Sequence, residues 1–213
     1  MKNLLRYAMC LAMLLQLLSL QAQVFTAQNI PDSIWTRMQG RSYPQECGIA
    51  RSELRYLELS HYDFNGEEHI GQIVCNRQIA DDLLYIFRKL YEAEYPIARM
   101  RLIDDYDASD QRSMADNNTS CFCYRRIAGS ETLSKHSRGM AVDVNPLYNP
   151  CLYVRSGRVL PPEGKPYAHN RSKRKDITGM IDASDLCYRL FLSRGFRWGG
   201  SWRSLKDYQH FEK

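Results

Sequence analysis

The chain has 213 residues, of which 44% are hydrophobic and 25% charged, a composition typical of a globular enzyme with one main domain. Its formal net charge is +5, and Lys2 and Arg6 supply two of these charges, which leaves +3 for the rest. So small and scattered an excess argues against nucleic acid as a partner, although it is compatible with an anionic polymer such as a cell wall. The densest basic cluster, residues 171–175, is interpreted as a solvated loop.

The N-terminal segment predicts export. Lys2 and Arg6 precede an apolar run that reaches Leu20, and Ala22 is a small residue suited to cleavage. We therefore expect residues 1–23 to be a secretory signal peptide and residues 24–213 to form a single domain, secreted or periplasmic. A retained membrane anchor is the alternative, but the run is short for a membrane span, and no second apolar stretch follows it.

Cysteine usage fits an exported protein. Cys10 lies in the apolar run, and six cysteines remain after it, namely Cys47, Cys75, Cys121, Cys123, Cys151 and Cys187. An even number in an oxidising compartment predicts disulfides, although the sequence does not select the pairing. A thiolate metal site at Cys121 and Cys123 is a further possibility.

The first half of the chain predicts a helix, a hairpin and a second helix. Apolar spacing predicts a short helix over residues 28–40. Residues 55–64 and 67–75 read as two strands, and Asn65-Gly66 predicts a tight turn between them. A helix with apolar residues at helical spacing follows from Ile79 and must end before Pro96.

The second half alternates short elements with long polar segments. Residues 100–103 and 140–145 resemble strands, and residues 184–194 resemble a helix that Gly195 can end. The irregular segments 108–134 and 147–180 are long enough to suggest functional loops. After the Trp198-Gly199-Gly200 turn, we expect a final strand that carries His210.

Two candidate metal ligands lie close together in the sequence. Seven extended residues would separate His136 from Asp143 by roughly 23 Å, so the chain must reverse between them for both to reach one ion. Gly139 makes a turn possible at the right place. Strand alternation after it puts Ala141, Asp143 and Asn145 on one face and the apolar residues on the other. His210 is the favoured third ligand, because a C-terminal segment rich in aromatic residues should dock into the domain.

The combined pattern resembles a known family. The chain resembles the M15 metallopeptidases in three motifs. These are Ser-x-His-x-x-Gly-x-Ala-x-Asp at residues 134–143, Trp-Gly-Gly-x-Trp at 198–202 and Asp-x-x-His-Phe-Glu at 207–212. That family contains D-alanyl-D-alanine carboxypeptidases and dipeptidases and related peptidoglycan endopeptidases. The resemblance extends from about Tyr56 to Glu212.

The resemblance implies one zinc ion per chain, held by His136, Asp143 and His210. It implies that Asp207 is the general base, at a position where many relatives have Glu. It also implies an α+β fold, a small antiparallel sheet with flanking helices, shared with the hedgehog signalling domain. For the remaining roles, Arg125 is our first choice and Arg101 our second as the arginine that stabilises the oxyanion, and Ser134, Ser120 and Trp202 are candidate substrate residues.

The leading functional hypothesis is a monomeric D-alanyl-D-alanine carboxypeptidase that acts on peptidoglycan stem peptides. An L-Ala-D-Glu or cross-link endopeptidase is the alternative cleavage. A hedgehog-like binding module that contains zinc but does not catalyse is the alternative of another class, and an interaction domain held by disulfides, without metal, is the third. Two histidines and a carboxylate can also hold iron, although iron oxygenases commonly space the first two ligands more closely.

Overall fold

A computed structural model describes residues 23–127, 130–174 and 177–213. Cys10 and nearly all of the expected signal peptide lie outside the described residues. The predicted hairpin is confirmed as β2 (Leu54–Tyr62) and β3 (Glu68–Asn76), with β1 (Phe25–Gln28) antiparallel to β2 on the other edge.

The hairpin turn is wider than Asn65-Gly66 predicts. Tyr62 pairs with Glu68, so residues 63–67 form the connection, and Gly66 has a φ of 77°. The Asp63 carboxylate accepts hydrogen bonds from the amides of Asn65 (2.8 Å) and Glu67 (2.9 Å). An aspartate side chain thus closes the turn from inside the loop, which a two-residue turn would not need.

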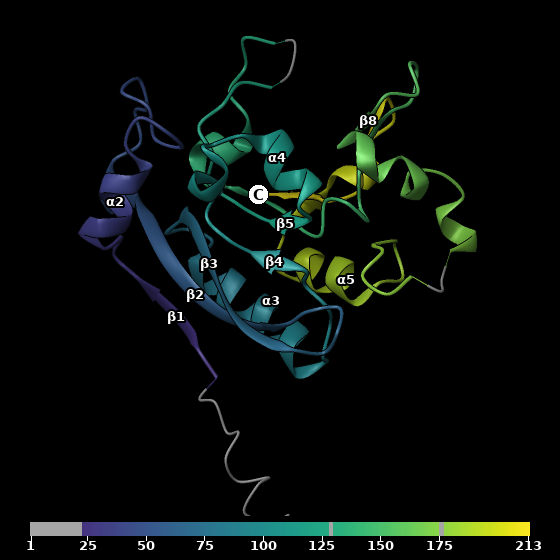
Figure 1. Cartoon of the computed structure of the whole chain (residues 1–213), viewed down its shortest axis with the longest axis horizontal. Helices are drawn as coiled ribbons and strands as arrows, with labels where there is room; N and C mark the ends of the chain where they lie inside the picture. The colour runs from purple at the N-terminus through teal and green to yellow at the C-terminus, as the bar shows by residue number, and fades with distance from the viewer. Residues whose placement is uncertain (1–22, 128–129, 175–176) are drawn as a thin grey trace, which may run out of the picture.

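α3 (Ala80–Glu92) packs along one face of this sheet, and α2 (Asp32–Met38) lies beside one end of β2 (Figure 1). Strand alternation directs Leu57 and Ile73 into the main core with α3, while Tyr56 and Val74 pack into a second core with α2. Both helices lie within the segments that the apolar spacing predicts. Gln28, the first residue of the first segment, is instead the last residue of the extended β1.

The C-terminal helix joins the same core. α5 (Leu186–Ser193) begins at Asp185, whose carboxylate accepts a hydrogen bond from the Cys187 amide at 2.8 Å. Phe191 of α5 meets Phe87 of α3 edge to face, with ring centroids 6.4 Å apart. The main core therefore joins the hairpin to the C-terminal part of the chain.

The segments predicted as irregular contain several short elements. They are α4 (Asp110–Ala115), β5 (Asn118–Thr119), β7 (Cys151–Tyr153), β8 (Val159–Leu160) and the 3₁₀ turns η4 (Pro162–Tyr167) and η5 (Arg171–Lys173). The predicted strand at 100–103 is limited to β4 (Arg99–Met100), which pairs in parallel with β5. The 3₁₀ turn η2 (Ile103–Tyr106) follows β4, and another, η1 (Arg51–Glu53), precedes β2. Strands of two or three residues show no periodicity in a sequence, which is why the pattern missed them.

Arg171 is an exception to the interpretation of residues 171–175 as a solvated loop, in which Lys173 is exposed. Its side chain is buried and donates hydrogen bonds to the carbonyl oxygens of Tyr148 (2.8 Å), Tyr167 (2.9 Å) and Ile181 (2.8 Å). Its guanidinium also lies 4.1 Å from the ring centroid of Tyr208. Arg171 therefore anchors the segment 147–180 to the rest of the domain.

The predicted late strands form a third sheet of β6 (Ala141–Asp143), β11 (His210–Glu212) and β9 (Arg197–Trp198) in the order β6-β11-β9. A further sheet has the order β10-β7-β8, where β10 is Leu205–Asp207. The α+β class is thus confirmed. The expectation of one small antiparallel sheet is corrected: the described residues form three such three-stranded sheets and a parallel pair.

The cysteines correct the expectation of disulfides. All six cysteines of the described residues are free thiols, and all are buried. They lie within the packed interior, where a free cysteine behaves as a small apolar residue. In the same part of the chain, no helix is both long enough and apolar enough to span a bilayer.

Candidate metal centre

A direct strand pairing places two of the predicted ligands side by side. In the antiparallel pair of β6 and β11, His210 lies opposite Asp143, and Phe211 lies opposite Val142. Val142 and Phe211 are fully buried in the main core, so the polar pair faces the other way. The alternation predicted for residues 140–145 is confirmed for β6, whereas Asn145 lies beyond the strand with a φ of 45° and its side chain bonds to the backbone of Pro96 and Ala98.

His136 arrives from a 3₁₀ turn, η3 (Lys135–Arg138). The Ser134 hydroxyl accepts a hydrogen bond from the His136 amide at 3.3 Å, and Gly139 ends the turn with a φ of 64°. A Cβ at Gly139 would lie 2.6 Å from the Asn76 nitrogen of β3. The predicted reversal at Gly139 is confirmed, and only glycine fits there.

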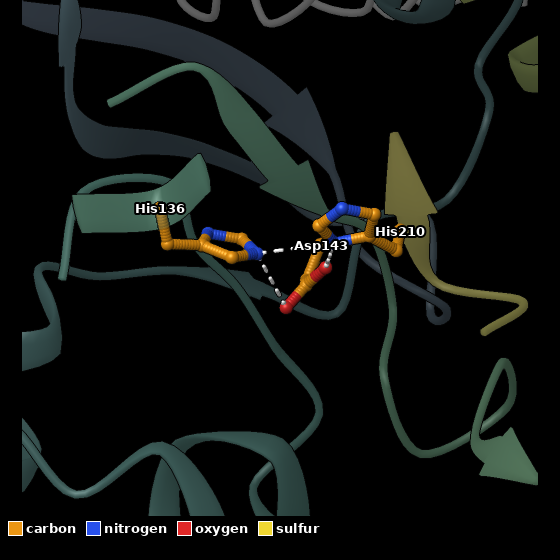
Figure 2. Close-up of side chains that lie close together, drawn as sticks. All are labelled: His136, Asp143 and His210. Atoms are coloured by element: carbon orange, nitrogen blue, oxygen red, sulfur yellow. Dashed lines mark hydrogen bonds and ion pairs between the residues drawn. The ribbon is translucent and has the colours of Figure 1, made fainter. Parts of the chain in front are cut away.

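The three side chains meet around one point, as Figure 2 shows. His136 Nε2 lies 3.2 Å from Asp143 Oδ2, His210 Nδ1 lies 3.0 Å from Asp143 Oδ1, and the two ring nitrogens are 3.2 Å apart. All three residues are buried, with 2%, 3% and 6% of the surfaces of His136, Asp143 and His210 exposed. Zinc bonds of about 2.1 Å in a tetrahedral site separate neighbouring donors by roughly 3.4 Å, so these spacings suit one ion.

Hydrogen bonds behind the cluster determine which ring nitrogens face inward. His136 Nδ1 is 2.6 Å from the Cys121 carbonyl oxygen, which can only accept, so Nδ1 carries a proton. His210 Nε2 lies 3.3 Å from the Glu212 carboxylate and donates to it. In the neutral imidazoles, the lone pairs of His136 Nε2 and His210 Nδ1 then point toward Asp143 and toward each other. Such convergence needs a positive charge at its centre, and two nitrogens with one carboxylate are the donor set of a catalytic zinc site.

The pKa values of His210 and Asp143 also indicate that the cluster favours a positive charge. Burial opposes a charge on His210, but its hydrogen bonds to Asp143 and Glu212 raise its pKa to about 10, so when no ion is bound the ring takes up a second proton and is itself the cation beside Asp143. Burial alone would raise the pKa of Asp143, yet the two histidines hold it well below its ordinary value. Asp143 is therefore the anion of the cluster, and a cation is strongly favoured beside it.

Asp207 lies in the same pocket as the cluster. It ends β10 opposite Cys151 of β7, and Gln209 Nε2 donates to its Oδ1 at 3.2 Å. The pKa of Asp207 is raised to about 6, mainly by burial. The positive charge of His210 lowers this pKa, and the negative charge of Asp143 raises it further. A carboxyl group with a pKa near neutrality can both accept and return a proton.

Gly199 leaves room for this arrangement. A Cβ at Gly199 would lie 2.7 Å from the Asp207 carbonyl oxygen, 2.9 Å from the Asp207 Cβ and 3.2 Å from the His210 Cβ. The sequence predicts only a turn at residues 198–200, and the short η6 (Gly199–Ser201) is indeed there. The close approach to Asp207 and His210 depends on tertiary packing, so the sequence alone does not predict it.

A pocket of about 450 Å³ opens onto the cluster. Seven residues predicted for the site line it, namely His136, Asp143, His210, Asp207, Arg125, Ser134 and Trp202. The ring centroid of Trp202 lies 5.4 Å from that of His210. Ser120 is not part of this lining; its amide and carbonyl pair with the backbone of Asp143 instead. Arg101, the second choice for the oxyanion arginine, lines a different hollow, beside the hairpin.

Glu212 is a site residue that the sequence analysis missed. It follows His210 by two residues on β11, and its carboxylate contacts His210 Nε2. The hydrogen bond lowers the pKa of Glu212. The period of two along a strand could have predicted that these side chains share a face.

A second group of possible ligands, Asp63, Glu67 and His69, lies at the hairpin turn. Its residues are more exposed than the buried cluster. One oxygen of Asp63 is engaged by the backbone amides of the turn, and the other lies 3.2 Å from His69 Nε2. These contacts account for the group as part of the turn.

The comparison with known proteins concerns the C-terminal part of the chain. Residues 128–213 match a family model described as D-alanyl-D-alanine carboxypeptidase. The match includes His136, Asp143, Asp207 and His210, and it is shorter than the resemblance from Tyr56 onward. No solved structure matches the chain.

Proposed function

We propose that the chain is a zinc-dependent peptidase of the M15 type that removes the terminal D-alanine from peptidoglycan stem peptides, and the family model that matches residues 128–213 supports this. The observation that carries the proposal is the buried His136, Asp143 and His210 cluster, which shares one pocket with Asp207. A purely structural metal site needs no titratable carboxylate in an open pocket beside it.

His136, Asp143 and His210 would hold the ion. The Cys121 carbonyl and the Glu212 carboxylate would orient the two imidazoles from behind. When bound, zinc lowers the pKa of a water molecule and polarises the scissile carbonyl.

Asp207 is proposed as the general base and acid. Its raised pKa, about 6, lets it accept a proton from the attacking water near neutral pH and return it to the leaving amine. Asp207 stands where many relatives have Glu, and Gly199 packs closely against its backbone.

Arg125 is proposed to stabilise the negative charge that develops on the carbonyl oxygen. Its guanidinium lies in the pocket wall, and it carries a permanent positive charge. Burial opposes its charge, but the charge of Asp110, and after it those of Asp143 and Asp207, raise its pKa.

The pocket lining carries three cationic side chains beside four carboxylates, those of Asp110, Asp143, Asp207 and Glu212, and we propose that the cationic side chains select a terminal carboxylate over an internal bond. The cationic side chains are those of Arg125, Lys135 and Arg138. A free carboxylate at the end of a stem peptide would be attracted by these charges. Endopeptidase cleavage, of L-Ala-D-Glu or a cross-link, is the alternative and needs the pocket to admit chain on both sides of the bond.

A hedgehog-like binding module is the alternative from another class. It would account for a metal on an α+β domain without turnover. The position of Asp207 within the same pocket argues for catalysis instead.

Product analysis separates these readings. Zinc-loaded protein is incubated with defined muropeptides that carry a D-alanyl-D-alanine end, and the products are identified by mass. Loss of a single D-alanine supports the proposal, internal fragments indicate an endopeptidase, and no cleavage by zinc-loaded protein contradicts both. Asp207→Asn, which keeps the side chain's size, is the inactive control.

We further propose that the enzyme acts outside the cytoplasm as a monomer, with residues 1–23 directing export. The expected result is a processed N-terminus near residue 24 on protein recovered from the periplasm or medium. Recovery of the unprocessed chain from the cytoplasm alone would contradict this. Sedimentation of the purified protein tests the monomer.

A further inference from the structure

Asp110 and Arg125 form an ion pair in the wall of the pocket. Arg125 Nη2 lies 3.0 Å from Asp110 Oδ2, and the side chains are 28% and 29% exposed. The neighbouring pair of Arg112 and Asp107 is far more exposed, at 58% and 64%. Because ion pairs weaken as water surrounds them, the pair of Asp110 and Arg125 should restrain its partners more strongly.

The backbone of Arg125 is fixed to the turn that carries His136. The Arg125 amide donates to the Ser137 hydroxyl at 2.8 Å, and that hydroxyl donates to the Arg125 carbonyl at 2.6 Å. Two residues earlier, the Cys123 amide donates to the carbonyl of His136 at 3.2 Å. These hydrogen bonds fix the backbone of Arg125 relative to the cluster. The guanidinium, at the other end of the side chain, needs a further restraint.

The guanidinium has donors left after pairing with Asp110. Its Nε is buried and has no hydrogen-bond partner within the part of the chain that the structure describes. Two competing carboxylates, Asp143 and Asp207, line the same pocket. A flexible arginine could fold onto either one, which would neutralise a metal ligand or the base.

We propose that Asp110 is a positioning residue, which holds the Arg125 guanidinium in the pocket wall, available to the substrate's developing oxyanion and away from Asp143 and Asp207. The inference rests on the proposed peptidase function. Asp110 does not contact the reacting atoms itself; it acts through Arg125. It opens α4, within the segment that the sequence analysis treats as irregular, which is why it was not among the predicted site residues.

The first test compares Asp110→Asn with Asp116→Asn in zinc-loaded protein. Asp116 caps the other end of α4 and pairs with Arg99 at 3.3 Å, outside the pocket lining, so it is a matched control. We expect Asp110→Asn to lower kcat and kcat/KM equally, by about 10-fold to 100-fold, with KM nearly unchanged, because the restraint acts on a transition-state contact. Asp116→Asn should match the wild type, and Asp110→Glu should recover most of the loss by restoring the carboxylate.

A double-mutant cycle shows whether Asp110 acts through Arg125. In an Arg125→Met background, Asp110→Asn should cause no further loss of kcat, because the group that it positions is gone. An equal loss in both backgrounds would overturn the proposal and assign Asp110 a general structural role. Zinc content is measured for every variant and should not change.

An NMR measurement keeps the proposal independent of turnover. The buried Arg125 Nε–H should give a slowly exchanging ¹⁵N signal, assigned by its disappearance in Arg125→Lys. We expect this signal to exchange rapidly in Asp110→Asn and to persist in Asp116→Asn. A signal unchanged by Asp110→Asn overturns the positioning role. If zinc-loaded wild type cleaves no peptidoglycan peptide, the proposed function fails, while this measurement still decides whether Asp110 restrains Arg125.

Discussion

His136 Nδ1 lies 2.6 Å from the carbonyl oxygen of Cys121, so the backbone, and not the cysteine side chain, sets the tautomer of this histidine. Cys121 is buried, and its Sγ contacts the Gly139 carbonyl oxygen at 3.6 Å. A thiolate metal site at Cys121 and Cys123 is therefore not needed to explain the cluster.

This relationship predicts that Cys121→Ala and Cys123→Ala keep about one zinc per chain. Each loses stability, on the order of 1–2 kcal/mol, because a buried side chain is shortened in the packed interior. Metal analysis of the purified variants and thermal unfolding check both parts. Loss of zinc from either alanine variant would favour the thiolate reading instead.

Removing a ligand should remove the metal. His136→Ala and His210→Ala are expected to fall from about one zinc per chain to near zero, because two donors hold zinc far more weakly than three. His169→Ala changes an exposed histidine outside the pocket lining and should retain full metal content. Elemental analysis after dialysis against a weak chelator gives the result. Full zinc in both ligand variants would refute the site.

Glu212 should tune the affinity without being a ligand. Glu212→Gln removes the charge that His210 Nε2–H contacts, and we expect zinc affinity to fall about 10-fold to 100-fold. Arg197→Met is the control, since Arg197 pairs with the same carboxylate at 2.6 Å from the exposed side. Competition with a chromogenic chelator measures both. An unchanged affinity in Glu212→Gln would show that the contact is incidental.

The pKa of Asp207 predicts a pH dependence of activity and of stability. Activity should rise with pH as the base loses its proton, with a midpoint below the ion-free value of about 6 because bound zinc favours the ionised carboxylate, and Asp207→Asn should lose turnover while keeping zinc.

The folded-state pKa of Asp207 lies above its ordinary value of 3.8, so this group stabilises the fold at low pH. That contribution is lost as pH rises through about 6, because the folded state then gives up a proton that it binds more tightly than the unfolded state does. Asp207→Asn should therefore unfold at a higher temperature than wild type at pH 7, and the difference should shrink toward pH 4. Metal-free protein is used for this comparison, and a lower melting temperature for the variant at pH 7 would contradict it.

Gly199 should be required for the geometry of the site. Gly199→Ala would place a Cβ 2.7 Å from the Asp207 carbonyl oxygen, so the strand that carries Asp207 must shift. We expect kcat to fall at least about 10-fold and stability by about 1–3 kcal/mol. Gly48→Ala is the control, because a Cβ there meets nothing within 4 Å. Activity equal in the two variants would show that the close approach is not needed.

The elements with clear periodicity were predicted well, and the short ones were not. α3 and the β2–β3 hairpin follow from apolar spacing, whereas the turn at residues 63–67 depends on the Asp63 side chain. β7 pairs with the nearby β8 on one side and with β10, which is distant in sequence, on the other. Local sequence carries no record of such partners.

The candidate site divides in the same way. His136, Gly139 and Asp143 are close in sequence, and their turn-and-strand geometry could be derived from residue types alone. The distant groups that complete the site needed tertiary structure: Asp110 for Arg125, Gly199 for Asp207 and the Cys121 carbonyl for His136. Disulfides were expected from the count of cysteines, but burial of each thiol in the interior accounts for that residue type equally well.

The pairing of His210 with Asp143 joins positions 67 residues apart in the chain. An ion held there would tie the two ends of that long loop, as a covalent bridge would, in a chain whose six described cysteines are unbridged. Closing a long loop reduces the freedom of the unfolded chain, so the metal should protect the whole fold as well as the reaction. Chelation would then lower the melting temperature and expose the C-terminal strand to proteases, and zinc supply would set the lifetime of the protein as well as its activity.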